Sequence, residues 1–223
     1  MEYSTFLNEL KTYAEKDFAK FQRKLIPTQQ TILGVRTPTM RKLAKKYQAE
    51  YKDIFSFPDD YFEVTFIKLA QIAVLPYTQF IQYVEACVDK IDNWAICDCF
   101  KAKCLFKQKT DFIPILEKLF VNKGEFYQRY VLVVLLSTYI EEGYLPLIES
   151  FLKRADKTKY YVYMAAAWLT AEVLVKHYDY GVQWLQTKIL DVKTHNKAIQ
   201  KARESYRLSK EQKGFLKSLK IKQ

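Results

Sequence analysis

Hydrophobic and polar positions alternate with a helical period along nearly the whole chain. Two segments, residues 126–140 and 160–175, are apolar on almost every side. A helix without a polar face is packed between other helices. The pattern therefore predicts an inner layer of apolar helices that is covered by partner helices.

Residues that favour helix ends punctuate this pattern. Thr37 is a predicted N-cap, and Pro38 follows it at the first helical position. Ser209 and Gln212 have the spacing of a capping box. The N-cap role is also predicted for three further polar residues, each before a helix: Asp59 before 61–75, Asp92 before 93–106 and Thr110 before 111–120. Gly124, Gly143 and Gly181 are predicted stops or hinges. We expect roughly eleven or twelve helices of about ten to eighteen residues.

A chain of helix pairs with a buried inner layer favours a short α-solenoid, in which each pair covers its neighbour's apolar side. We predict an all-α, curved solenoid of about five to six HEAT-like helix pairs with a basic concave face. A globular helical bundle is the alternative. No linker or low-complexity stretch interrupts residues 1–223, which predicts a single domain.

Composition narrows the class of protein. The 223 residues are 49% hydrophobic and 16% aromatic, which excludes a disordered chain. Five glycines and six prolines are too few for a β-sandwich or barrel. No apolar run has the length of a membrane span, and the first residues lack the pattern of a signal peptide. We expect a cytoplasmic monomer.

Positive charge is concentrated near the C-terminus. The formal net charge is +11, and eleven basic but only three acidic residues lie between positions 188 and 223. Such a surface indicates a polyanionic partner, most often nucleic acid, although a solvated helix on a basic protein gives the same count. The basic residues that we single out for DNA binding are Lys197, Lys201, Arg203 and Arg207.

The four cysteines do not have the spacing of a zinc site. Cys97, Cys99 and Cys104 fall in one apolar stretch, and Cys87 precedes it without a nearby histidine. Buried, reduced thiols are the better interpretation. We predict no metal site and no cofactor.

Trp94 and Asp98 are the first candidates for chemistry. They lie four residues apart and therefore on one face of a helix. An acid within Trp-Ala-Ile-Cys-Asp-Cys-Phe is costly to bury unless it has a partner. Facing a cleft, this carboxylate stabilises a developing cation; the alternative is a structural hydrogen bond to a neighbouring element.

Arg129 and Trp168 are unusual in their own apolar helices. In its apolar helix, the Arg129 guanidinium either pairs with a carboxylate such as Asp98 or binds a phosphate. Trp168 follows a run of small residues and shares a face with Glu172, although core packing is the default for such a tryptophan.

Together these motifs resemble the HEAT-like-repeat DNA glycosylases of bacterial DNA alkylation repair. The likeness covers most of the chain. The segments that carry it, in order, are Leu33-Gly34-Val35-Arg36-Thr37-Pro38-Thr39-Met40-Arg41, Trp94 with Asp98, Gln128-Arg129, Trp168, and Lys197-Ala198-Ile199-Gln200-Lys201-Ala202-Arg203-Glu204-Ser205-Tyr206.

The resemblance implies a function and roles for single residues. Family members hydrolyse the N-glycosidic bond of cationic N3- and N7-alkylpurines in duplex DNA without a metal, and leave the base largely outside a dedicated pocket. Asp98 is then the catalytic carboxylate, and Trp94 and Trp168 pack against the lesion nucleotide. Arg129 holds a nearby phosphate.

Two positions differ from the family pattern and keep other functions open. Ala171 stands where such glycosylases have a second arginine, and Pro27 interrupts the early segment that enters the minor groove. The chain is accordingly a glycosylase with Asp98 at its centre, a non-catalytic paralogue that binds DNA weakly, or a scaffold for an acidic protein.

Overall fold

The computed structural model describes residues 1–122 and 124–222, and most of this part of the chain is helical. It forms fourteen α-helices and three short 3-10 helices, and its β structure is limited to an isolated parallel bridge between Thr31 and Tyr61. The protein is therefore all-α, and its consecutively packed helices make it solenoid-like, as the sequence predicts. Contacts between Cα atoms divide the chain into two compact units, Met1–Gln108 and Lys109–Gln223. The single domain, the curvature and the basic concave face stay predictions.

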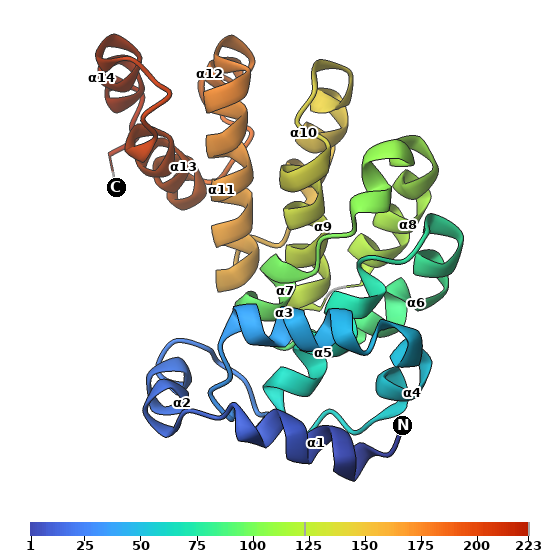
Figure 1. The fold of residues 1–223 in the computed structure, drawn as a ribbon. Helices are drawn as coiled ribbons and strands as arrows, with labels where there is room; N and C mark the ends of the chain where they lie inside the picture. The colour runs from blue at the N-terminus through green and yellow to red at the C-terminus, as the bar shows by residue number, and fades with distance from the viewer. Residues whose placement is uncertain (123, 223) are drawn as a thin grey trace. The chain divides into compact units, whose positions relative to one another are not determined.

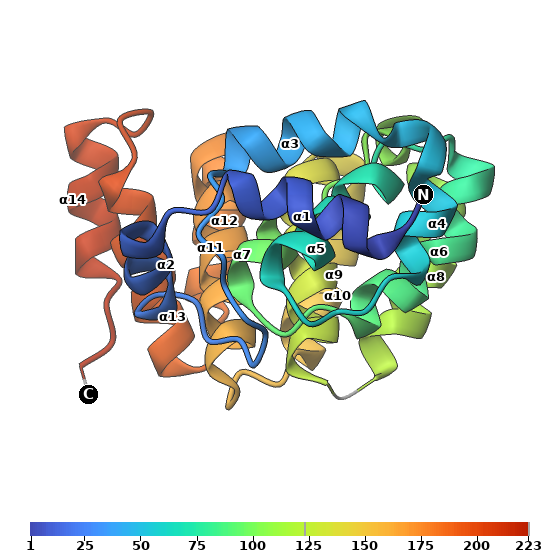
Figure 2. The ribbon, with the colours of Figure 1, turned by 60° about the horizontal axis from the view of Figure 1, so that its bottom comes forward.

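The first unit is built around α5, which contacts α3, α4, α6 and α7. The views in Figures 1 and 2 both show α3 alongside α5. Ten of the eleven residues of α5 are buried. The elements of this unit are α1 (Tyr3–Thr12), α2 (Lys16–Arg23), α3 (Thr37–Lys46), η1 (Gln48–Glu50), α4 (Tyr51–Ser56), α5 (Phe62–Ile72), α6 (Tyr77–Asp89), α7 (Trp94–Cys99) and η2 (Lys103–Lys107).

A fully buried carboxylate fixes the loop that leads into α3. The Glu63 side chain accepts hydrogen bonds from the backbone N–H groups of Leu33 (3.1 Å), Gly34 (2.8 Å) and Val35 (3.2 Å). Burial raises the pKa of Glu63, although the three N–H donors oppose that rise. Gly34 has φ +86°, and a Cβ atom there would lie 2.3 Å from the carbonyl oxygen of Glu15. The Leu33-Gly34-Val35 part of the motif is thus explained by backbone geometry.

The second unit has two layers of helices. Its inner helices α9, α11 and α13 contact one another in sequence, and α8, α10, α12 and α14 each contact one of them. This is the arrangement of stacked helix pairs, and Figure 1 shows the pairs following one another from α8 to α14. Its elements are α8 (Lys109–Val121), α9 (Glu125–Thr138), η3 (Glu142–Tyr144), α10 (Leu145–Arg154), α11 (Tyr160–Lys176), α12 (Tyr178–Gln186), α13 (Val192–Glu204) and α14 (Lys210–Ser218).

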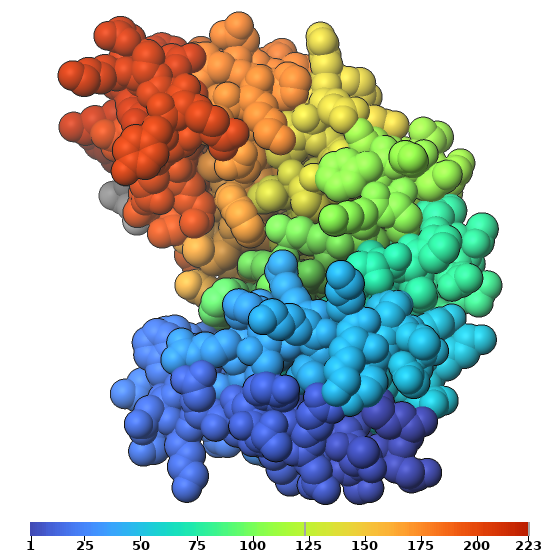
Figure 3. All heavy atoms as spheres, in the orientation of Figure 1, coloured from blue at the N-terminus to red at the C-terminus, as the bar shows by residue number. Residues whose placement is uncertain are grey.

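The apolar segments predicted at 126–140 and 160–175 are α9 and α11, and both are buried along most of their length. Side chains of α13 and α14, drawn in red in Figure 3, form the surface at the C-terminal end of this unit on the face shown. The capping box of Ser209 and Gln212 is confirmed at the start of α14.

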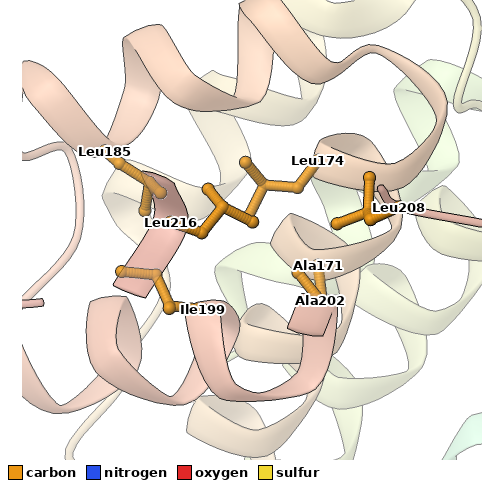
Figure 4. Packing of buried hydrophobic residues seen from close by; sticks show 7 residues of the cluster. All are labelled: Ala171, Leu174, Leu185, Ile199, Ala202, Leu208 and Leu216. Atoms are coloured by element: carbon orange, nitrogen blue, oxygen red, sulfur yellow. The ribbon is translucent and has the colours of Figure 1, made fainter. Parts of the chain in front are cut away.

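A compact apolar cluster joins the last four helices. Figure 4 shows its seven buried residues pointing toward one another: Ala171, Leu174, Leu185, Ile199, Ala202, Leu208 and Leu216. Gly181, predicted as a stop or hinge between helices, instead lies inside α12, where a Cβ atom would come within 2.9 Å of the Leu174 Cα atom. The glycine therefore lets α12 approach α11 closely.

Several of the predicted helix ends are wrong, and tertiary contacts explain why. The predicted helix 93–106 ends at Cys99, because Phe100 leaves the helical region and buries its ring against Phe80, with ring centroids 5.9 Å apart. Asn93, not Asp92, caps α7, and Arg36 rather than Thr37 occupies the N-cap position of α3.

The predicted caps Asp59 and Thr110 also have other roles. Asp59 binds the ammonium groups of Lys68 (2.7 Å) and Lys90 (2.5 Å), and Tyr61 takes the N-cap position of α5. Thr110 lies inside α8, which begins one residue earlier. Within the described residues, none of the helices has both the length and the apolar character needed to cross a membrane.

Candidate nucleic-acid interface

Helix α7 presents Trp94 and Asp98 on its partly exposed side. Both side chains are half-buried, whereas Ile96 and Cys97 between them are buried where α7 packs against α5. The four-residue spacing places the indole and the carboxylate on one face, as the sequence predicts. Asp98 is therefore accessible from the surface of the first unit and is not sealed in its core.

The N-terminus of α7 is held by hydrogen bonds to the segment that contains Pro27. The indole Nε1 of Trp94 donates to the Leu25 carbonyl oxygen at 2.9 Å. The Asp92 carboxylate accepts from the Thr28 hydroxyl (2.5 Å) and from the backbone N–H of Gln29 (3.3 Å). Helix α2 ends at Arg23, so residues 24–30 form a loop, as Pro27 predicts. This loop orients the indole instead of continuing a helix.

Cationic side chains lie close to the C-terminal end of α7. Desolvation raises the pKa of the Cys99 thiol, while the Arg41 guanidinium, which lies within hydrogen-bonding reach, and the charge of Lys101 oppose that rise. Cys99 is exposed, so the expectation of buried thiols is wrong at this position. It is correct for Cys87 and Cys97, while Cys104 has intermediate exposure.

Arg129 lies in α9 and is 5% exposed. Its Nη1 donates to the Tyr161 carbonyl oxygen at 3.0 Å, and the guanidinium lies 5.7 Å from the centre of the Tyr161 ring. Glu125, one turn earlier, accepts from the Tyr161 backbone N–H at 2.7 Å. These contacts fix the first turn of α11 against α9, so Arg129 has at least a structural role.

Trp168 lines a cavity of about 230 Å³ between α11 and the end of α13. Ala171 and Glu172 belong to the same wall, which agrees with the predicted shared face of Trp168 and Glu172. The residues that line the cavity are Trp168, Ala171, Glu172, Val175, Lys201, Glu204 and Ser205. No sequence signal marks Glu204 and Ser205 as neighbours of Trp168, because they lie at the end of another helix, α13.

The four basic residues predicted to bind DNA occupy different environments. Lys197 and Lys201 lie one helical turn apart on α13, and Lys197 donates to the Gln200 side chain at 3.2 Å. The Nε atom of Arg203 is buried without a hydrogen-bond partner. Arg207 binds the Glu172 carboxylate through Nη2, at 3.0 and 2.8 Å from its two oxygens.

Lys193 is a further basic residue of α13, beyond the four that the sequence predicts to bind DNA. It lies four residues before Lys197 and is exposed on the same helix, and its ammonium is 4.2 Å from the centre of the Tyr163 ring. The spacing of 193, 197 and 201 was the signal that identifies this basic stripe.

The family model described as "DNA alkylation repair enzyme" matches residues 6–207. The chain belongs to the family of DNA alkylation repair enzymes. No curated protein sequence matches it significantly. The match includes both units, and therefore Trp94 and Asp98 as well as Trp168 and the residues of α13.

Family membership connects the chain with DNA alkylation repair and indicates DNA as the substrate. For a DNA alkylation repair enzyme, the two most informative features are the carboxylate-bearing face of α7 and the indole-lined cavity of α11 and α13. Among the described residues, no group of three or more His, Cys, Asp and Glu side chains is arranged to hold a metal ion.

Proposed function

We propose that the protein is a DNA glycosylase that hydrolyses the N-glycosidic bond of cationic N3- or N7-alkylpurines in duplex DNA. The observation that carries this proposal is the position of Asp98, half-buried beside Trp94 on the accessible face of α7. Membership of the alkylation repair family supports the choice of substrate.

The chemistry requires little beyond a correctly placed carboxylate. When the C1′–N bond breaks, its electron pair neutralises the alkylated base, which leaves as an uncharged molecule. The sugar becomes cationic in the transition state, and a nearby carboxylate stabilises that charge. A water molecule then bonds to C1′, and its proton passes to Asp98 or to solvent.

Trp94 has a positioning role in this proposal. Its bond to Leu25 fixes the indole at the start of α7, and the carboxylate follows one turn later on the same face. Positively charged side chains attract the phosphates of the duplex: Arg41 and Lys101 near Cys99, and Lys193, Lys197 and Lys201 on α13.

The test is release of 7-methylguanine and 3-methyladenine from methylated duplex DNA. We expect the Asp98→Asn variant to lose at least about a hundredfold in single-turnover rate, which is the usual effect of removing one transition-state-stabilising group. Asp17→Asn is a matched control, because Asp17 is an almost fully exposed aspartate in α2 of the same unit. Equal release by wild type and Asp98→Asn, or no release above background, contradicts the proposal.

A second candidate is a non-catalytic protein that binds DNA through phosphate contacts. Three positions favour this second function. The guanidiniums of Arg129 and Arg207 already bind protein oxygens, and Ala171 stands where the glycosylases that the chain resembles have a second arginine. This function predicts affinity that falls steeply with salt and shows little preference for lesions. Lesion-selective binding at high salt excludes it.

A further inference from the structure

A cavity larger than the one beside Trp168 lies in the outer layer of the second unit, between α10 and the end of α12. Its volume of about 450 Å³ is within the roughly 300–1,000 Å³ that is typical of ligand-binding pockets. The residues that line it are Glu149, Lys153, Tyr180, Gln183, Trp184, Thr187, Lys188 and Ile189. This set contains no residue of the candidate nucleic-acid interface, so the cavity is available for another partner.

Hydrogen bonds and ring packing hold the two helices together at this cavity. One Glu149 carboxylate oxygen accepts from the indole Nε1 of Trp184 at 2.9 Å, and the other lies 2.7 Å from the Lys153 ammonium. Trp184 is buried, and the Tyr180 ring packs edge-on against it with ring centroids 5.5 Å apart. Because both Glu149 oxygens are engaged, its negative charge is already compensated within the protein.

Lys188 lines the same cavity in a backbone conformation that favours glycine. Its φ is 53°, the one positive φ of a residue other than glycine in the part of the chain that the structure describes. The backbone N–H of Lys188 donates to the Leu185 carbonyl oxygen at 3.2 Å, and that of Ile189 donates to the Trp184 carbonyl oxygen at 3.3 Å. These two bonds after the last turn of α12 form a Schellman motif, whose left-handed position is usually glycine. A lysine at this position therefore lowers the stability of the helix end relative to glycine.

The helix end alone does not explain why this residue is a lysine. Unfavourable backbone conformations cluster at sites of function, where the side chain repays the cost. The Lys188 ammonium has neither an ion pair nor a hydrogen bond with the residues that the structure describes, whereas Lys153 is paired with Glu149. Two lysines and one glutamate give the lining a net charge of +1, next to the apolar surfaces of Tyr180 and Ile189. The cavity thus matches a ligand that joins a carboxylate to an apolar group.

We propose that this cavity binds a short acidic segment of a partner protein, in which a carboxylate pairs with Lys188 and a neighbouring aromatic side chain packs against Tyr180 and Ile189. A peptide matches both parts of the lining, and tyrosine and tryptophan are enriched at protein interfaces. A DNA backbone supplies charge alone and brings phosphates close to the Glu149 carboxylate. The proposal does not depend on the glycosylase activity, because the proposed catalytic and DNA-binding residues lie elsewhere.

The test is fluorescence anisotropy of a short labelled peptide that alternates aspartate with phenylalanine, titrated with the full chain near physiological salt. We expect saturable binding, and binding at least about tenfold weaker when alanine replaces each phenylalanine, because the apolar contact is lost. The alanine peptide retains every carboxylate, so it controls for general attraction to a protein of net charge +11. Equal affinity of the two peptides, or displacement of the peptide by undamaged duplex DNA, overturns the proposal.

Variants of Lys188 separate backbone strain from recognition. Lys188→Gly is expected to raise Tm by about 2–4 °C, because glycine adopts this φ without strain, and to weaken peptide binding about tenfold, because the cation is lost. Lys188→Arg keeps the charge and is expected to bind the peptide as the wild type does. Unchanged affinity in Lys188→Gly overturns the proposal, and a Tm that does not rise removes the strain on which it rests.

A second lysine provides the matched control for charge. Lys217 is exposed in the last turn of α14 and lies outside the cavity, so Lys217→Gln removes one positive charge elsewhere in the same unit. We expect this variant to bind the peptide with wild-type affinity. A loss equal to that of Lys188→Gly overturns the assignment of the cavity, because net charge alone would then explain the binding.

Discussion

The buried carboxylate of Glu63 is the best single test of how the first unit is stabilised. Its two oxygens accept three backbone N–H groups, at 2.8–3.2 Å, from the loop that precedes α3. In Glu63→Gln, one amide oxygen still serves the N–H groups of Gly34 and Val35, because Oε1 accepts from both of them. The new NH₂ group faces the Leu33 N–H, and one buried donor loses its acceptor.

The magnitude follows from these contacts. An unsatisfied buried donor costs about 1–3 kcal/mol, and the two remaining bonds each weaken by about 1 kcal/mol when the acceptor loses its charge. Removing a buried charge recovers part of this cost, since burial already raises the pKa of Glu63. We expect a net loss of about 2–3 kcal/mol in the free energy of unfolding, or about 5–10 °C in Tm for a chain of this size.

Thermal unfolding followed by circular dichroism measures the effect, and the ion pair between Glu15 and Arg36 supplies the control. Glu15 binds the Arg36 guanidinium at 2.7 Å, but both side chains are about half exposed. Solvent screens exposed ion pairs, so Glu15→Gln is expected to lower Tm much less than Glu63→Gln does. Equal shifts for the two variants would refute the reasoning, because burial would then not determine the cost.

Three further predictions concern the same unit. Gly34→Ala destabilises it by at least about 1–2 kcal/mol, because φ +86° is unfavourable for alanine and the Cβ meets the Glu15 carbonyl oxygen; urea unfolding measures the loss. Burial alone raises the pKa of Asp59, but hydrogen bonds from Lys68 and Lys90 hold that pKa below its usual value. The ionised carboxylate therefore stabilises the fold at pH values above its unfolded pKa, and this stabilisation is lost as the pH falls through the folded pKa. In Asp59→Asn, the free energy of unfolding therefore depends less on pH in the acid range. At neutral pH the variant is less stable by about 3 kcal/mol, because the buried Lys68 loses its counter-charge. An unchanged dependence of the unfolding free energy on pH would contradict this. Trp94→Phe is expected to slow the proposed base excision severalfold with little change in Tm, because it removes the hydrogen bond to Leu25 but retains an aromatic ring; a loss of Tm with unchanged excision would assign the indole a purely structural role.

The sequence predicted the elements whose signals are local. The apolar faces of α9 and α11 and the capping box of α14 are encoded by consecutive residues, and all three are confirmed. The spacing of Trp94 and Asp98 likewise predicted their shared face on α7.

Predictions failed where a distant residue competes for the same group. Asp92 has the chemistry of an N-cap, but Thr28 and Gln29 bind its carboxylate, and neither is near it in sequence. The break after Cys99 depends on the packing of Phe100 against Phe80, which no local pattern reports. For the same reason the cavity beside Trp168 was not predicted, because Lys201 and Glu204 come to it from another helix.

Because Cys99 is exposed, the protein can be labelled next to Asp98 without an engineered cysteine. Cys87 and Cys97 are buried, so a maleimide dye reaches the Cys99 sulfur first and Cys104 second. Because desolvation raises the pKa of the Cys99 thiol, labelling is expected to be faster at mildly alkaline pH. The label then sits one residue from Asp98 without any engineered substitution. In unlabelled protein, an oligonucleotide that carries a tethered disulfide at successive positions can be trapped on Cys99 by thiol–disulfide exchange, which releases the small thiol of the tether. The position that reacts fastest identifies the nucleotide that approaches the carboxylate.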